Sequence, residues 1–161
     1  MTRAVVAFGA NLGDREATIA QAVAELADTP GVELVAVSPV YETPAIKLSG
    51  VDHDAPGYLN GVLLLETELE PLALLDALQR VEQAHGRVRE ERWGDRTLDL
   101  DLIDHGGARL IDARLELPHP RAWQRAFVLQ PWLDVDPDAV VAGRGTVAEL
   151  RAAADDEVRR R

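Results

Sequence analysis

Two aspartates, Asp99 and Asp101, are the residues of this chain whose types and spacing most clearly suggest chemistry. They lie in the segment TLDLDLI at positions 97–103. In an extended strand successive side chains point to opposite faces, so the leucines share one face and the carboxylates share the other. Two carboxylates one pleat apart repel each other unless a cation lies there. The pair is a candidate metal site, and the alternative is a solvated strand face that happens to carry two aspartates.

Arginines are concentrated in the segment directly before this strand. Residues 86–96, GRVREERWGDR, contain four arginines, a tryptophan and two glycines. Mg²⁺ takes one or two carboxylates together with phosphate oxygens, and guanidinium groups bind the remaining oxygens in bidentate fashion. The loop and the aspartates together predict a polyphosphate site. The chain has a single lysine, Lys47, so arginine is its usual cation, and a solvated loop whose arginines pair with Glu90, Glu91 and Asp95 is the alternative.

Three further residues are candidates for ligand contacts. Tyr58 and Asn60 lie two apart in an expected strand, so they face the same way and offer a flat ring and an amide that both donates and accepts hydrogen bonds. A planar heterocycle would suit them, although both residue types are also common at strand starts and turns. His119 lies between two prolines in a rigid loop, where it either contacts a phosphate or lies on the surface. The sequence contains no Walker loop and no Gly-x-Ser-x-Gly elbow.

Length and composition favour one soluble domain over residues 1–161. The 161 residues suffice for a hydrophobic core, and the lack of cysteine excludes disulfides and thiolate metal sites. The apolar start is too short for a signal peptide and no later run has the length of a membrane helix, so we expect a cytoplasmic protein without membrane contacts. A net charge of -11 speaks against a nucleic-acid partner, because a phosphate backbone would be repelled.

The expected secondary-structure elements alternate between strands and helices. Strands are expected at 5–8, 32–41, 58–66 and 97–103, with one helix from Asp14 and another from Pro71 to about Gly86. A loop is expected at 42–57 and a strand or hairpin at 108–117. An aromatic segment at 123–132 and a helix that opens with a capping box at 146–149 follow.

The order β-α-β-β-α-β is that of a ferredoxin-like α+β sandwich, here with additional C-terminal helices. In this fold helices pack on one face of an antiparallel sheet, and we expect the other face to be free for a ligand. The same strand order also occurs in modules that sense small molecules or bind proteins and catalyse nothing. A binding module has no need of two carboxylates opposite several guanidinium groups, so the candidate site favours an enzyme.

Six short motifs follow one another along the chain: GANLGD at 9–14, SPVYETP at 38–44, YLN at 58–60, GRVR at 86–89, ERWGDRTLDLD at 91–101 and PHP at 118–120. Together they resemble the hydroxymethyldihydropterin pyrophosphokinases of folate biosynthesis. The resemblance extends over nearly the whole chain, from residue 4 to about residue 137. The run from Arg92 to Asp101 is highly specific to that family, whereas the N-terminal glycine turn is weak on its own.

The resemblance implies that Asp99 and Asp101 bind two Mg²⁺ ions that bridge the phosphates of ATP, the co-substrate. The residues implied to bind the nucleotide are Arg87 and Arg96, nearest to the chemistry, with Gln79, Glu82, Arg89, Arg92, Trp93, Leu102, Arg114, His119 and Arg125. The residues implied to bind the pterin are Thr43, Pro44, Ile46, Tyr58, Asn60, Trp93 and Phe127. The pterin ring would stack between Tyr58 and Phe127.

The implied reaction moves the diphosphoryl group of MgATP to the hydroxymethyl group of 6-hydroxymethyl-7,8-dihydropterin and releases AMP. Position and charge, rather than a general base, would carry the catalysis. Small molecules are the expected partners, and a monomer is the expected state. A metal-dependent phosphoryl or nucleotidyl transferase with another acceptor is the alternative. Ala10, Ala45, Glu116 and the long segment 45–57 depart from the family pattern, so contacts there are not implied.

Overall fold

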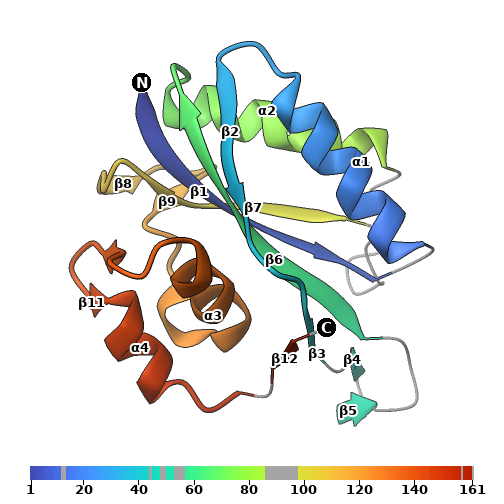
Figure 1. The fold of residues 1–161 in the computed structure, drawn as a ribbon. Helices are drawn as coiled ribbons and strands as arrows, with labels where there is room; N and C mark the ends of the chain where they lie inside the picture. Colours follow the sequence, from blue (N-terminus) through green and yellow to red (C-terminus); the bar gives the residue numbers. More distant parts are fainter. Residues whose placement is uncertain are drawn as a thin grey trace.

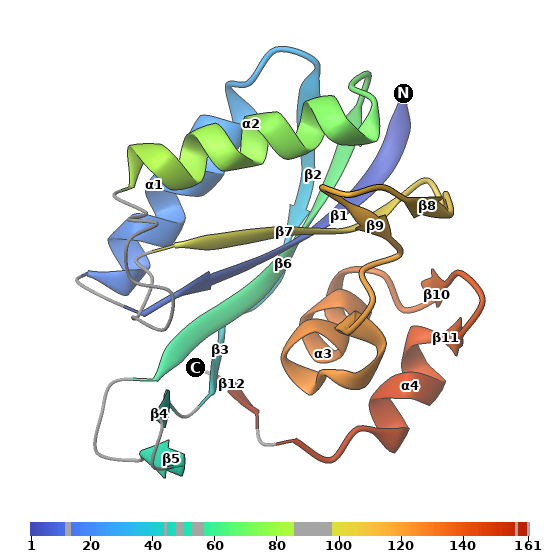
Figure 2. The same cartoon turned by 180° about the vertical axis from the view of Figure 1, so that it is seen from behind.

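One six-stranded sheet with helices on both faces organises the molecule (Figures 1 and 2). The structure, a computed structural model, describes residues 1–11, 14–43, 45–47, 50–52, 57–85, 98–156 and 158–160, with the backbone alone at 45–47 and 50–52. The helices are α1 (Arg15–Ala27), α2 (Pro71–Ala84), the 3₁₀ helix η1 (Ala122–Gln124), α3 (Ala126–Val135) and α4 (Val147–Ala153). Within the described residues no helix is long and apolar enough to cross a membrane.

The main sheet has the antiparallel order expected from the sequence. Its strands are β1 (Thr2–Ala10), β2 (Val32–Val37), β3 (Tyr41–Thr43), β6 (Tyr58–Thr67), β7 (Asp99–His105) and β12 (Arg159–Arg160). β1 lies between β6 and β7, and both β2 and β3 pair with the far side of β6. With α1 after β1 and α2 after β6, the predicted β-α-β-β-α-β sandwich and its additional C-terminal helices are confirmed.

Short hairpins complete the set of strands and test the expectations for residues 42–57 and 108–117. They are β4 (Ala45–Lys47) with β5 (Gly50–Asp52), β8 (Leu110–Ile111) with β9 (Glu116–Leu117), and β10 (Val140–Val141) with β11 (Gly145–Thr146). The hairpin expected at 108–117 is confirmed. The loop expected at 42–57 is wrong in part, because it contains the end of β3 and the β4–β5 hairpin.

The single strand expected at 32–41 is divided into β2 and β3 at Pro39. Proline has no N–H to donate to a ladder, so the pairing is interrupted there. The neighbouring Ser38 keeps the chain attached to β6, because its N–H donates to the Val62 carbonyl and its Oγ accepts from the Val62 N–H, both at 2.9 Å. The strand therefore resumes as β3, which pairs with the beginning of β6.

Helices α1 and α2 pack on one face of the sheet. Asp14 caps α1, since its Oδ1 accepts from the Ala17 N–H at 3.1 Å, and Pro71 occupies the first turn of α2. Leu26 and Leu74 of these helices are fully buried. They face alternate residues of the strands, among them Val6, Phe8, Leu63, Leu65, Leu98, Leu100 and Leu102.

The opposite face of the sheet is covered in part, which corrects the expectation that it is free for a ligand. Helix α3 lies over it, and α4 packs beside α3 farther from the sheet, in both views (Figures 1 and 2). Trp132 and Leu129 of α3 form a second core with the sheet residues Val5, Val62, Leu64 and Ile103. Each of these apolar side chains gains about 1.5–3 kcal/mol from burial, so this part of the face requires a cover. Its polar residues lie instead where β1 ends and β6 and β7 begin.

The end of the chain returns to the main sheet. Helix α4 begins after Thr146, whose Oγ1 accepts from the Glu149 N–H at 3.1 Å, as the capping motif predicts. Beyond α4, Arg159 pairs with Glu42 and Arg160 with Tyr41, so β12 forms an edge beside β3 (Figure 1). Segments far apart in sequence therefore meet at this corner.

Candidate active site

The aspartate pair lies on the partly covered face of β7. Leu98, Leu100 and Leu102 are buried on the other face, whereas Asp99 is half-buried and Asp101 is exposed. The alternation is the one that the sequence predicts. Across the ladder Asp99 is paired with Gly9 and Asp101 with Ala7 of β1. The two carboxylates are thus held on one side of a regular strand.

Gly9 lies between Asp99 and Asn60 in the sheet and leaves room for the Asn60 amide. It is paired with Asp99 on one side and with Asn60 of β6 on the other, so all three lie in one row of the sheet. A Cβ at Gly9 would lie 3.2 Å from Asn60 Oδ1, closer than most side-chain contacts. Because glycine brings no side chain, the amide oxygen of Asn60 can lie close to the backbone here. The sequence motif contained this glycine, but its spatial role requires the register.

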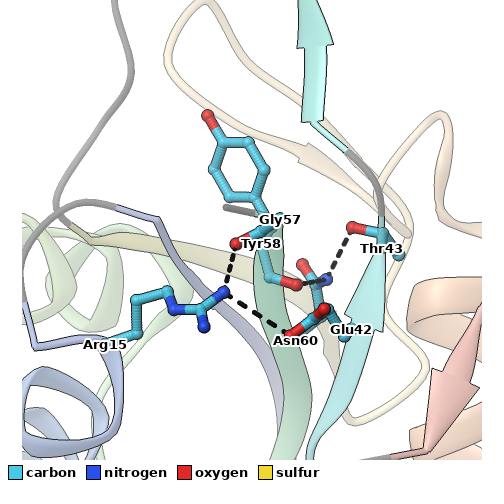
Figure 3. Close-up of polar contacts among 6 residues, drawn as sticks. All are labelled: Arg15, Glu42, Thr43, Gly57, Tyr58 and Asn60. Carbon is cyan, nitrogen blue, oxygen red and sulfur yellow. Dashed lines mark hydrogen bonds and ion pairs between the residues drawn. The ribbon is translucent and has the colours of Figure 1, made fainter. Parts of the chain in front are cut away.

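Asn60, Tyr58 and Thr43 gather at the end of this row (Figure 3). Asn60 Nδ2 donates to Thr43 Oγ1 at 3.0 Å and to the Tyr58 carbonyl at 3.3 Å. These bonds fix the orientation of the amide and direct its Oδ1 toward the surface above Gly9. Tyr58 and Thr43 are paired residues of β6 and β3, so they share the face of Asn60. The structure therefore brings together three of the residues expected to bind the pterin.

Arg15 supports this corner and was not among the predicted site residues. Its Nη1 donates to the Gly57 carbonyl at 2.6 Å and lies 3.6 Å from Glu42 Oε2 (Figure 3). A Cβ at Gly57 would lie 2.1 Å from the Thr43 carbonyl oxygen, so β3 and the start of β6 approach as only glycine permits. The arginine joins the first helix to both strands. The one feature of the sequence that pointed to Arg15 is its position directly after Asp14, the residue that caps α1.

His119 lies in the loop beside β7. Its N–H donates to the Ile103 carbonyl at 2.9 Å, and its Nδ1 accepts from the Arg121 N–H at 3.2 Å. Burial lowers the pKa of His119 below its usual value, and the positive charges of Arg125 and Arg121 act in the same direction, while Asp101 and Glu116 oppose it. With Nδ1 accepting, a neutral ring carries its proton on Nε2. The imidazole is thus suited to donate one hydrogen bond.

Helix α2 brings Gln79 and Glu82 to the outer edge of β7. Glu82 is buried, and its Oε2 accepts from the Leu100 N–H at 2.9 Å. Gln79 Oε1 accepts from Arg114 Nη2 at 3.3 Å, and the same guanidinium binds Asp76. Predicted nucleotide residues from α2 and from the β8–β9 turn therefore contact one another. The buried side chain of Leu102 leaves only its backbone for a ligand.

Arg125 and Phe127 lie on either side of the first residue of α3. The guanidinium carbon of Arg125 is 5.5 Å from the centroid of the Phe127 ring, a cation–π distance. Both side chains are half-buried. The other predicted residues, Pro44, Arg87, Arg89, Arg92, Trp93 and Arg96, lie outside the described residues, and Ile46 is described by its backbone alone.

The donor set fits Mg²⁺ rather than a metal enclosed by protein ligands. Among the described residues no group of three or more His, Cys, Asp or Glu side chains is arranged to hold a metal. Two carboxylates on one strand are what Mg²⁺ takes when water and phosphate oxygens complete its shell. Asp99 and Asp101 are accordingly the residues that would hold it.

A pocket of about 520 Å³ lies next to His119. It is bounded by the β8–β9 hairpin, the loop at 118–120, Trp123 and the turn at 142–144. The guanidinium carbon of Arg144 is 4.3 Å from the centroid of the Trp123 ring. Since His119 and Glu116 line this pocket, it adjoins the candidate site.

Comparisons with known proteins agree on one family. The family model of 7,8-dihydro-6-hydroxymethylpterin-pyrophosphokinase matches residues 5–137. A 2-amino-4-hydroxy-6-hydroxymethyldihydropteridine pyrophosphokinase of Methylorubrum extorquens is 44% identical over 155 residues, which are 96% of this chain and 95% of that protein. One of the same name from Pseudomonas aeruginosa is 43% identical over 151 residues, 94% of this chain and 91% of that protein.

A solved structure supports the same fold. The crystal structure of Plasmodium falciparum HPPK-DHPS wild type with pteroate matches with a TM-score of 0.70 at 14% identity and covers 94% of this chain. The chain spans 42% of that longer chain. The matched residues 5–137 include most of β1, the strands β2 to β9 and the helices α1 to α3. The chain therefore belongs to the 7,8-dihydro-6-hydroxymethylpterin-pyrophosphokinase family.

Proposed function

We propose that the sheet face bearing Asp99, Asp101 and Asn60 is where this protein transfers the diphosphoryl group of ATP to 6-hydroxymethyl-7,8-dihydropterin. As a member of its family, the protein is an ATP-dependent diphosphotransferase of folate biosynthesis. The observation that carries the placement is the row Asp99, Gly9 and Asn60, which joins a metal-binding end to a ring-binding end across one glycine. The acceptor oxygen and the phosphates would meet above that glycine.

The pterin side of the site is explained by fixed polar groups. Asn60 Nδ2 is engaged by Thr43 and by the Tyr58 carbonyl, so Oδ1 is oriented to accept a hydrogen bond from an N–H of the pterin edge. The Tyr58 ring, with Phe127 from α3, would stack on the heterocycle and add about 0.5–1.5 kcal/mol beyond area burial. In the row Asp99, Gly9 and Asn60, the lack of a side chain at Gly9 would let the pterin ring lie close to the backbone.

The nucleotide side is explained by charge. When bound by Asp99 and Asp101, two Mg²⁺ ions would neutralise phosphate oxygens and polarise the phosphorus under attack. His119, neutral and with Nε2–H as donor, binds a phosphate oxygen, and Arg125 adds a positive charge next to it. Gln79, Glu82 and Arg114 hold the far end of the nucleotide. The residues proposed to enclose the triphosphate come from the segment before β7 and are Arg87, Arg89, Arg92, Trp93 and Arg96.

The reaction needs little beyond position and charge. The hydroxymethyl oxygen attacks the β-phosphorus in line, the bond to the α-phosphate oxygen breaks, and AMP leaves with that oxygen. Positive charges held in place by the protein's own residues, with the metal when it is bound, would supply most of the acceleration. We further propose that residues 1–161 form one domain, and that the protein acts as a cytoplasmic monomer on small molecules, with no nucleic-acid partner.

Analysis of the nucleotide product tests this function. The protein is incubated with MgATP and 6-hydroxymethyl-7,8-dihydropterin, and the nucleotides are separated at short times. We expect AMP and diphosphorylated pterin in equal amounts. ADP would indicate an ordinary kinase, pyrophosphate a nucleotidyl transferase, and no turnover a binding module; each of these would refute the proposal.

A further inference from the structure

The residues described after α4, 154–156 and 158–160, contact both elements that frame the pterin side of the candidate site. This segment leaves α4 and ends beside β3, as both views show (Figures 1 and 2). Midway, both carboxylate oxygens of Asp156 accept from the N–H of Ala126, at 3.0 and 2.9 Å. Neither the contact of Asp156 with Ala126 nor the pairing of β12 with β3 takes part in the reaction itself.

Asp156 takes the place of a missing helix cap. The first N–H groups of a helix have no partner within the helix, and a carboxylate near them is favourable for the helix dipole. In α3 the residue at the N-cap position is Arg125, whose side chain makes no capping bond. The cap comes instead from 30 residues further along the chain. Arg125 and Phe127 are the immediate neighbours of the capped residue.

A side-chain network fixes the start of this segment against α3 and β3. Arg151 of α4 donates from Nε to Gln130 Oε1 at 2.8 Å and from Nη1 to the Ala154 carbonyl at 3.2 Å. Gln130 Nε2 donates to Asp134 Oδ1 at 3.2 Å, and the hydroxyl of Tyr41 donates to the other oxygen of Asp134. The segment, α3 and β3 are therefore parts of one hydrogen-bonded assembly.

The far end of the segment acts on the other half of the pterin side. β12 pairs with β3 through Arg159 and Arg160, which lie opposite Glu42 and Tyr41. These two residues of β3 directly precede Thr43. Thr43 Oγ1 in turn accepts from Asn60 Nδ2. One segment thus holds the strand that orients Asn60 and the helix end that carries Phe127.

We propose that Asp156 is a positioning residue for the pterin. By capping α3 it fixes the distance between Phe127 and the sheet residues Tyr58 and Asn60, so that the ring-binding space exists before the substrate arrives. The inference rests on the proposed function and goes beyond it, because Asp156 touches no substrate. Preorganisation of this kind raises the affinity for the substrate, because the start of α3 is already ordered by Asp156 and does not have to be ordered when the pterin binds.

The test compares Asp156→Ala, Asp156→Asn and the control Asp155→Ala, which removes the adjacent exposed carboxylate. Binding of the pterin is measured by calorimetry in the presence of Mg²⁺ and a non-hydrolysable ATP analogue, at a temperature where all variants are fully folded. We expect Asp156→Ala to weaken pterin binding about fivefold, the effect of losing one hydrogen bond, with binding of the ATP analogue changed less than about twofold. Asp156→Asn keeps one acceptor oxygen and should recover most of the affinity.

Two outcomes would overturn the inference. If Asp156→Ala lowers the unfolding temperature while the pterin affinity stays that of the wild type, the residue is only structural. If Asp155→Ala weakens pterin binding as much as Asp156→Ala, local charge and not the cap is responsible. If the wild-type protein yields AMP and the variants show one of these two results, this inference is refuted and the proposed function stands. A wild-type protein that binds no pterin refutes the proposed function and this inference with it.

Discussion

At the scale of single residues, the aspartate pair is held by strand alternation and not by a loop. Leu98, Leu100 and Leu102 are buried, so Asp99 and Asp101 cannot leave their face without exposing three leucines. A carboxylate pair on a rigid strand would be preorganised for the metal proposed to bind there, which is what catalysis by charge requires.

The first prediction concerns replacement of the two aspartates. Asp99→Asn and Asp101→Asn should each lower the rate of AMP formation by about 10³-fold or more, because a neutral amide binds Mg²⁺ poorly. The free energy of unfolding should change by less than about 1 kcal/mol, since neither side chain is part of the core. Steady-state kinetics and urea unfolding check both parts. Asp138→Asn, which removes an exposed carboxylate outside the site, serves as the matched control; an Asp101→Asn enzyme with near-normal turnover would contradict the metal assignment.

Tyr41 gives a pH-dependent prediction. Burial, together with its hydrogen bond to the carboxylate of Asp134, raises the pKa of Tyr41 from 10.0 to about 12. Above pH 10 the unfolded chain has lost the phenolic proton that the folded protein still holds, so stability should fall as the pH rises until the folded group also ionises near 12. Tyr41→Phe should lose about 1 kcal/mol near neutral pH with the hydrogen bond and then show a shallower decline in alkali.

Urea unfolding of wild type and Tyr41→Phe at a series of pH values between about 8 and 11.5 makes this comparison. The difference between the two proteins isolates Tyr41 from the other groups that titrate in this range. Equal slopes in alkali would show that the phenol is not protected in the folded state.

At the scale of elements, β7 is an edge strand that needs support on its open side. The Leu100 N–H points away from β1 and is satisfied by the carboxylate of Glu82 on α2. An edge N–H left buried without a partner costs about 1–3 kcal/mol. The helix thus fixes the strand that carries both aspartates.

The third prediction concerns this contact. Glu82→Ala should lower the free energy of unfolding by about 2–4 kcal/mol, because it leaves a buried donor without its acceptor and creates a cavity. AMP formation should fall as well, because the strand beneath Asp99 and Asp101 loses its support and the nucleotide loses the contact proposed at Glu82. Glu82→Gln retains an acceptor oxygen and should be milder. Gln83→Ala, at the exposed neighbouring position, is the control, and a Glu82→Ala protein as stable as this control would contradict the role.

Local patterns predicted most elements because each depends on neighbours in sequence. The alternation around Asp99, the helix start near Asp14 and the capping motif at Thr146 all appear as the sequence indicates. The cover on the second face was missed, although β6 contained the signal. Its residues 62–65 form an unbroken apolar run, which is typical of a strand buried on both faces and not on one.

Contacts across long sequence separations could not be predicted in this way. Gly9 gains its role from a register that joins it to Asn60 and Asp99, and Asp156 caps a helix 30 residues away. No local period encodes either contact, because each depends on how distant elements pack. The contacts of Arg15 belong to the same class, since its partners are Glu42 of β3 and Gly57, directly before β6.

At the scale of the whole molecule, a net charge of -11 must accommodate a polyanionic substrate. A chain of this net charge repels ATP at long range, and attraction would arise close to the site, from the arginines proposed to bind the nucleotide and from Mg²⁺ if Asp99 and Asp101 hold it as proposed. The metal therefore should be necessary for the nucleotide to bind as well as for it to react.

The fourth prediction follows from linkage between binding and folding. A non-hydrolysable ATP analogue with Mg²⁺, at about a hundred times its dissociation constant, should stabilise the folded protein by about 2.7 kcal/mol. For a chain of this length that corresponds to a rise of about 5–11 °C in the unfolding temperature. The same analogue with a chelator in place of Mg²⁺ should produce a much smaller rise, and Asp101→Asn should abolish the difference between the two conditions. An equal shift with and without the metal would mean that the nucleotide binds through the arginines alone, and the aspartate pair would then have no part in holding it.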